Sequence, residues 1–273
     1  MRGVRLAHPR FQMTIHLDVV IGVGVLAGAW AGAWATRGAR PRGAEIAALA
    51  LALVALLGML NGPMHDLSDR VLFSAHMAQH LVLTLVVPPL VLLAVPGWMI
   101  DGLLRAARLD TLVRALTRPV PALALYTIAL VTWHLPAAYT RALEVHGWHI
   151  VQHLTLMAAA TLAWWPVLGR SSLAPRLPYA AQILHLFAFG MPMTAVAAMI
   201  TGSEALLYPF YAEAPRLVGL TPFDDQRLGG VLMWVPAAVV PLIAFTAVFF
   251  RWVAAERDED VAVRDPDERP ALR

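Results

Sequence analysis

Two pairs of histidines with the same spacing are the residues in this sequence best suited to chemistry. His76 and His80 belong to HMAQH, and His149 and His153 belong to HIVQH. On an α-helix, residues four apart project from one face, with Cβ atoms about 5–6 Å apart. Neutral imidazole is the most common metal-ligating side chain near physiological pH, so facing pairs from two helices could together bind one ion. The spacing therefore indicates a metal site between two helices.

The amino-acid composition narrows the choice of metal. The chain contains no cysteine, which excludes disulfides, thiolate metal sites and cysteine nucleophiles. Histidine and methionine ligands without cysteine favour copper over a structural zinc site. Thioether ligands could come from several methionines, although methionines more often pack in cores; they are Met64, Met77, Met191, Met193 and Met199. We therefore expect copper, if any metal is bound.

Further polar residues are predicted to lie near the same end of the molecule. Asp18 could accept a hydrogen bond from a ligating imidazole, or it could simply reach water at a helix end. Asp225 could bind metal, but capping of the final helix is the favoured interpretation. The histidines could also serve only to tie helices together through hydrogen bonds. The candidate metal ligands are His76, His80, His149, His153, His134, His65, Asp18 and Asp225.

The elements that must position these residues are expected to be transmembrane helices. Of the 273 residues, 59% are hydrophobic and 14% are charged, whereas soluble domains carry about 25% charged residues. Apolar segments of about 20 residues suffice to cross a bilayer. We predict an all-α integral membrane protein, a bundle of about seven transmembrane helices within residues 15–251. The expected spans are 15–35, 44–60, 71–95, 119–137, 148–168, 179–201 and 228–251.

The segments outside the bundle are charged. Residues 1–14 form a basic leader, and residues 252–273 form a charged tail that we expect to be disordered. Arginines concentrate in cytoplasmic loops of membrane proteins, and their distribution here places the N-terminus outside and the C-terminus in the cytoplasm. The excess of arginine is therefore explained by membrane topology and does not indicate that the protein binds nucleic acid. In this topology the histidine pairs lie in the outer leaflet, and only His185 lies nearer the cytoplasm.

Several motifs, in this order, make the chain similar to a known family. They are HMAQH followed by PP (76–89), WHLPAAY (133–139), HGWHIVQH (146–153), WWPVLG (164–169), LLYPFY (206–211) and DDQRLGGVLMW (224–234). Together these motifs cover about residues 60 to 250, and the chain resembles the CtaG family of multi-pass membrane cytochrome c oxidase assembly factors. The family's histidines fall on His76, His80, His134, His149 and His153, and its acidic-Gln element falls on Asp225 and Gln226.

The resemblance implies a protein of the bacterial inner membrane that is not an enzyme. Its expected partners are subunits of a haem–copper cytochrome c oxidase, and its expected role is to bind copper through outer-leaflet histidines and support copper insertion. A metal-free scaffold for oxidase assembly is an alternative. A bis-histidine haem protein is another, although paired histidines on one helix suit axial ligation poorly. A metal transporter would need polar residues through the whole membrane, and hydrolase or ATPase motifs are missing from the sequence.

Overall fold

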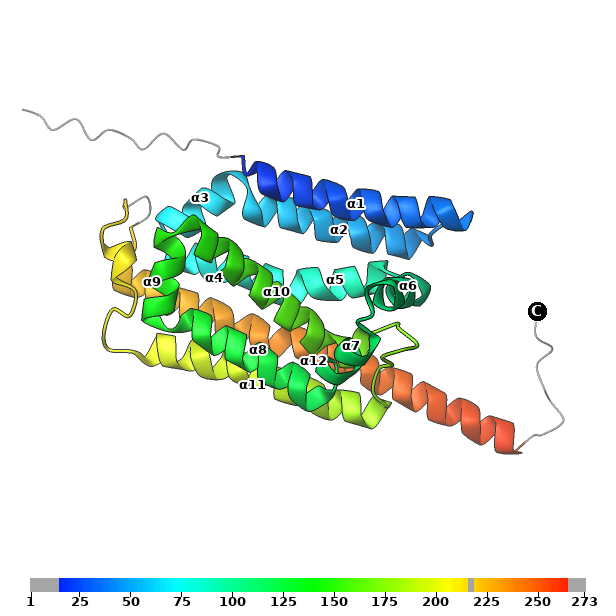
Figure 1. Ribbon diagram of the computed structural model, residues 1–273. Helices are drawn as coiled ribbons and strands as arrows, with labels where there is room; N and C mark the ends of the chain where they lie inside the picture. The colour runs from blue at the N-terminus through cyan, green and yellow to red at the C-terminus, as the bar shows by residue number, and fades with distance from the viewer. Residues whose placement is uncertain (1–14, 216–218, 265–273) are drawn as a thin grey trace, which may run out of the picture.

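The computed structural model describes residues 15–215 and 219–264, and within these ranges the chain is helical and contains no strand. The first half comprises α1 (Leu17–Arg37), α2 (Gly43–Leu60), α3 (Gly62–Arg70), α4 (Phe73–Leu81), the π-helix η1 (Val82–Val86), α5 (Val87–Ala94), α6 (Gly97–Ala107) and α7 (Asp110–Leu116). The second half comprises α8 (Pro119–His134), α9 (Pro136–Glu144), α10 (His146–Leu168), α11 (Tyr179–Gly202), the 3-10 helix η2 (Pro209–Ala212) and α12 (Pro222–Arg264). Figure 1 shows the long helices running side by side.

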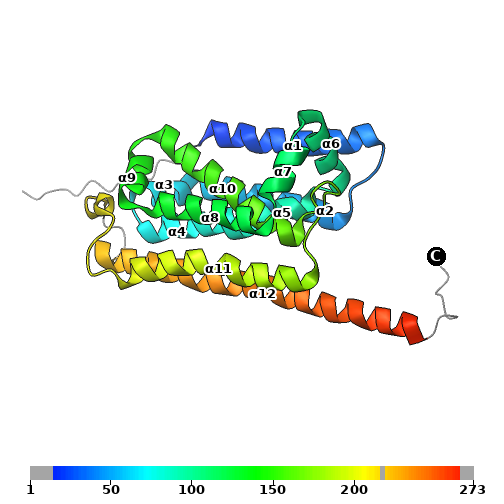
Figure 2. The same cartoon turned by 60° about the horizontal axis from the view of Figure 1, so that its bottom comes forward.

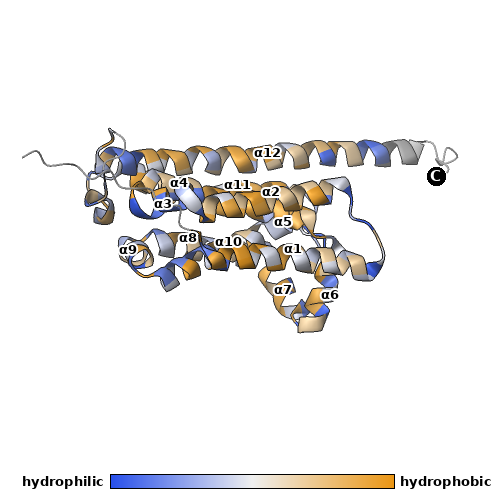
Figure 3. Ribbon diagram, turned by 90° about the horizontal axis from the view of Figure 1, so that it is seen from above, coloured by the Kyte–Doolittle hydropathy of each residue, from blue (hydrophilic) through white to orange (hydrophobic). Residues whose placement is uncertain are grey.

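Six of the described helices or continuous helical runs are long and apolar enough to cross a membrane, and α7 with α8 makes a seventh if this pair, bent by 76°, counts as one span. In Figure 3, apolar residues occupy the length of the bundle and hydrophilic residues gather at its two ends. This is the arrangement that a bilayer requires, because a charged side chain within hydrocarbon is costly. The prediction of an all-α multi-pass membrane protein is confirmed, whereas the orientation of its termini stays a prediction.

The predicted proline-containing third span is one continuous helical run from Phe73 to Ala94. Pro88 has no N–H to donate to the carbonyl of Thr84, four residues earlier. The helix widens into the π-helix η1, and the indole N–H of Trp164 on α10 donates to the Thr84 oxygen at 3.1 Å. The helix ahead of the proline therefore contains a π-helical segment, a feature that is frequent at functional sites.

The core lies between α4, α8, α10, α11 and α12, and its largest fully buried side chains include Phe73, Tyr126, Tyr139, Tyr208 and Tyr211. Helices α11 and α12 lie side by side in both Figure 1 and Figure 2. Helix α1 lies at the edge of the bundle against α2 and buries none of its residues. The histidine-bearing helices α4 and α10 thus occupy the interior, and α1 is peripheral.

The last helix is longer than expected. At about 1.5 Å per residue, the 43 residues of α12 span about 65 Å, roughly twice the hydrocarbon thickness of a bilayer. Its end projects beyond the other helices in Figures 1 and 2. The expectation of a disordered tail from residue 252 is therefore corrected as far as Arg264, because the helix continues into the charged residues. The leader 1–14 and residues 265–273 lie outside the described residues.

Candidate metal centre

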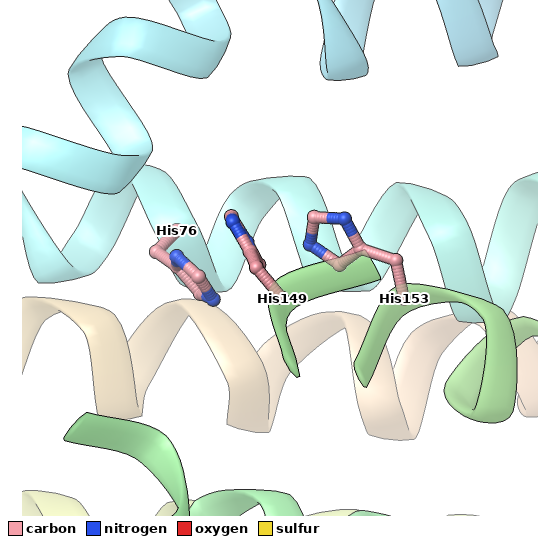
Figure 4. A group of neighbouring side chains, drawn as sticks. All are labelled: His76, His149 and His153. Carbon is pink, nitrogen blue, oxygen red and sulfur yellow. The ribbon is translucent and has the colours of Figure 1, made fainter. Parts of the chain in front are cut away.

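The two predicted histidine pairs face each other. His76 from α4 and His149 and His153 from α10 each offer a ring nitrogen, and the three nitrogens lie within 4.8 Å of one another. All three side chains are buried. Figure 4 shows the three rings next to each other between the two helices. This is a group of ligands from two helices, as one shared ion would require.

One ring nitrogen of each histidine in this group is without a hydrogen-bond partner. Among the described residues, none supplies a hydrogen bond to Nε2 of His76, of His149 or of His153, although all three atoms are buried. A buried polar atom without a partner costs free energy, and native structures contain few of them. Hydrogen bonds from the described residues leave these lone pairs unsatisfied, and a metal ion would satisfy them.

Asp69 on α3 holds the group from one side. Its Oδ2 lies 3.2 Å from Nδ1 of His149 and 3.2 Å from Nε2 of His65, and its Oδ1 lies 3.9 Å from Nδ1 of His76. Burial on its own raises the pKa of Asp69, but the hydrogen bond from His149 and the neighbouring histidines outweigh burial and hold the pKa well below its usual range. The carboxylate is therefore ionised, and His149 donates its Nδ1–H to it. This leaves Nε2 of His149 as the free ligand atom.

His65 belongs to a second possible group, which it forms with Asp69 and His149. The side-chain amide of Gln79 donates to the carbonyl of Met59 at 2.6 Å and lies 3.1 Å from Nδ1 of His65. This arrangement makes Nδ1 of His65 an acceptor and places its proton on Nε2, toward Asp69. Burial lowers the pKa of His65, more than Asp69 raises it. His65 is therefore neutral and able to ligate a metal.

The imidazole rings continue in both directions from this group. Neighbouring ring centroids are 4.2 to 6.2 Å apart along the whole series, which comprises His146, His16, His65, His149, His76, His153, His80 and His134. We call this series the histidine chain. It begins at a polar cavity of about 320 Å³ at the end of the bundle where α3 and α9 lie. The cavity is lined by His16, His65, Asp69, His146 and His149, among others.

Buried tyrosines lie beside the candidate metal-binding group. The ring centroid of Tyr139 lies 5.0 Å from that of His76, and the hydroxyls of Tyr139 and Tyr211 are 3.0 Å apart. Tyr211 donates to the carbonyl of Ser68 at 2.9 Å, and Tyr208 donates to the carbonyl of His134 at 2.8 Å. Burial raises the pKa of all three tyrosines, so they remain protonated donors. They connect η2 and α9 to the helix ends that carry the histidines.

Two predicted ligands lie elsewhere. Asp18 is exposed on α1 and lines an apolar groove between α1 and α10. Asp225 is fully buried, and its carboxylate accepts hydrogen bonds from the backbone N–H of Phe73 at 2.7 Å, from the N–H of Ser74 at 3.1 Å and from the Ser74 hydroxyl. Asp225 on α12 therefore caps α4, because the first N–H groups of a helix lack partners of their own, and its role as a metal ligand stays a prediction.

The hydroxyl of Thr221 caps the final helix. Thr221 and Asp224 exchange hydrogen bonds of 2.6 and 3.1 Å at the start of α12. Asp69 and Gln79 were absent from the predicted site. The available signal for Asp69 was its position four residues after His65 in a short polar segment, since that spacing places both on one helix face.

Comparisons with known proteins show one matching family and several relatives. A family model described as cytochrome c oxidase caa3 assembly factor (Caa3_CtaG) matches residues 26–255. An uncharacterised protein of Mycobacterium leprae is 26% identical over 212 residues, which is 71% of this chain and 32% of that protein. An uncharacterised protein of Mycobacterium bovis is 27% identical over 213 residues, with the same shares. The chain thus spans about a third of the length of these relatives. No solved structure matches it.

Proposed function

The chain belongs to the Caa3_CtaG family of cytochrome c oxidase caa3 assembly factors, and from this premise we propose that it binds copper through its buried histidines and supports insertion of that copper into the oxidase. The oxidase is then its partner, copper is its cargo, and the protein is not an enzyme. We place it in the bacterial inner membrane, with its N-terminus and the polar cavity on the outer side.

The observation that carries this proposal is the group of His76, His149 and His153. Each of these histidines offers a nitrogen within 4.8 Å of the other two, and in each the buried Nε2 has no hydrogen-bond partner among the described residues, which suits one metal ion. Among divalent first-row metals, copper binds nitrogen ligands most tightly. The rings of His76 and His149 are stacked, with centroids 5.6 Å apart, whereas the two axial ligands of a haem point their ring nitrogens at the iron from opposite sides. This orientation argues against the bis-histidine haem alternative.

The residues around the group could guide copper into the site and hold its histidine ligands in the tautomer that binds metal. The ionised carboxylate of Asp69 at the polar cavity attracts a cation toward His65 and His149. The same carboxylate fixes the tautomer of His149, so that Nε2 points its lone pair away from Asp69 and is available as a ligand. His65, Asp69 and His149 form the entrance group, and His76, His149 and His153 form the buried group. Because His149 belongs to both, an ion could move inward by exchanging the other ligands.

The test is the copper content of the detergent-purified protein after loading with Cu(II) and removal of excess metal. We expect about one copper per chain in the wild type and none in a His76→Ala/His149→Ala variant. His185→Ala is the matched control, because His185 is also buried and bonded to a backbone carbonyl at 2.7 Å, but it lies outside the histidine chain.

The second half of the test is the copper content of the oxidase in cells that carry each variant. Loss of copper from the oxidase with His76→Ala/His149→Ala, at unchanged abundance of the assembly factor, would support delivery. If the purified wild type binds no copper and the oxidase of the double-variant strain keeps all of its copper, the proposal is wrong and the metal-free scaffold replaces it.

A further inference from the structure

A second cluster of metal-binding side chains lies deeper in the bundle than the group just described. Helices α4, α8, α11 and α12 enclose a small cavity of about 10 Å³. Side chains with nitrogen or sulfur donors make up much of its lining, namely Met77, His80, His134, Met193 and Met233. Every one of these side chains is buried, with at most 4% of its surface exposed. They come from four segments far apart in the sequence and meet only in the folded protein.

The two histidines of this cluster are arranged as ligands. Among the described residues, neither ring nitrogen of His80 has a hydrogen-bond partner, and the same holds for Nε2 of His134. Nδ1 of His134 lies 2.7 Å from the carbonyl oxygen of Leu130, so Nδ1 carries the proton and donates it. A ring N–H bonded to a backbone carbonyl is the arrangement that orients metal-ligating histidines, since it leaves the other nitrogen with its lone pair.

The methionines determine which metal the cluster suits. Thioether sulfur is a soft ligand that selects Cu(I), whereas Zn(II) and Cu(II) prefer imidazole and oxygen donors. Packing alone could account for three methionines in a core, but it does not account for three buried imidazole nitrogens without partners at the same cavity. Methionines elsewhere on α11 behave differently: Met191 and Met199 are 58% and 52% exposed.

The size and charge of the cavity agree with a monovalent ion. A cavity of about 10 Å³ is at the lower limit for one water molecule, so a bare ion fits where a hydrated ion does not. Its lining includes no carboxylate. Burying a charge in an apolar interior is costly unless it is paired, and that cost grows with the charge. Neutral sulfur and nitrogen donors therefore suit Cu(I) better than a divalent ion.

We propose that Met77, His80, His134, Met193 and Met233 form a second site that is selective for Cu(I). It is connected to the first group through the neighbouring rings of His153 and His80, whose centroids are 5.4 Å apart. An ion that is already Cu(I) could pass between the sites by exchange of these two ligands, with no change of oxidation state. The inference rests on the proposed function only for the identity of the metal, because the cluster does not include His76 or His149.

The experiment measures Cu(I) bound by the detergent-purified full chain under anaerobic, reducing conditions, in competition with bicinchoninate. The test variant is Met193→Leu/Met233→Leu, which conserves side-chain volume and removes two sulfurs. Met191→Leu/Met199→Leu is the matched control on exposed methionines. X-ray absorption of the Cu(I)-loaded wild type provides an independent readout, because in a chain without cysteine copper–sulfur scattering must come from methionine.

We expect the wild type and the control to bind one Cu(I) more than Met193→Leu/Met233→Leu, and the copper–sulfur scattering to disappear in that variant alone. Loading with Zn(II) should show no difference among the three proteins. Equal Cu(I) binding by the wild type and both methionine variants would overturn the second site. A wild-type spectrum without copper–sulfur scattering would also overturn it, and this measurement remains valid even if a variant misfolds, because it uses the wild type alone. The His76→Ala/His149→Ala variant separates the two proposals, since it should keep the copper–sulfur signal while losing the Cu(II) bound at the first group.

Discussion

Replacement of Asp69 by asparagine tests the architecture of the metal centre most directly. Asparagine has the same shape, so it can still accept hydrogen bonds from Nδ1 of His149 and Nε2 of His65, each 3.2 Å from Oδ2 in the wild type. What the substitution removes is the negative charge. In the proposed function, that charge makes His149 a stronger ligand and attracts the cation to the polar cavity.

The magnitude follows from the position of Asp69 one contact away from the ligand atoms. Loss of a hydrogen-bonded partner behind a metal-ligating histidine typically costs 10–100-fold in metal affinity. Each factor of ten corresponds to about 1.4 kcal/mol of binding free energy, so we expect Asp69→Asn to weaken Cu(II) binding by roughly 1.4–2.8 kcal/mol. The number of copper ions bound at saturation should stay unchanged, because no proposed ligand of the buried group is removed.

The assay is titration of the purified protein with Cu(II) in the presence of a competing chelator of known affinity. Asp18→Asn is the control, because Asp18 is exposed on α1 and outside both ligand groups; this variant should bind Cu(II) like the wild type. An Asp69→Asn protein that folds normally and binds within about twofold of the wild type would refute the reasoning. An equal loss in Asp18→Asn would show a general charge effect instead.

Three further predictions concern the stability of the bundle. Asp225→Ala should lower the free energy of unfolding by about 2 kcal/mol or more, because buried N–H groups at the start of α4 lose a charged acceptor. Unfolding in denaturant measures this change, and an unchanged midpoint would contradict the cap. Gly230→Ala should destabilise the contact of α12 with α11, since a Cβ there would lie too close to the hydroxyl and the backbone nitrogen of Thr201. Unfolding in denaturant checks this, and a variant as stable as the wild type would contradict the prediction. Burial raises the pKa of Asp101, but hydrogen bonds from Ser171 and its neighbours outweigh burial and lower it, so the ionised carboxylate stabilises the fold above its unfolded pKa of about 3.9. The stability difference between wild type and Asp101→Asn should therefore be constant above about pH 5 and should shrink as the pH falls below about 4, and a difference that persists in acid would argue against this origin.

Much of the fold could be read from local pattern. The apolar segments set where the chain crosses the membrane, and the observed helices begin and end within a few residues of the predicted spans for most of the chain. The spacing of His76 and His80, and of His149 and His153, put each pair on one helix face. These features depend on neighbours in sequence, which is why hydropathy and helical period were enough. The final helix exceeded its apolar segment because helix hydrogen bonds continue into charged residues as readily as into apolar ones.

Which faces meet was decided by packing alone. Whether the two histidine pairs converge depends on how α4 and α10 are oriented about their axes, and the contacts that set this join residues distant in sequence, such as Asp225 with the start of α4. Asp69 reaches His149 from a separate short helix. The deeper cluster needs Met233 from α12, which no spacing in the sequence connects with His80 on α4. The sequence by itself determined which segments are apolar enough to cross a membrane, the absence of thiolate ligands and the faces that carry histidine. Only the tertiary structure decided which of those faces share a cavity, because side-chain packing between helices has no signature in the local period of any one of them.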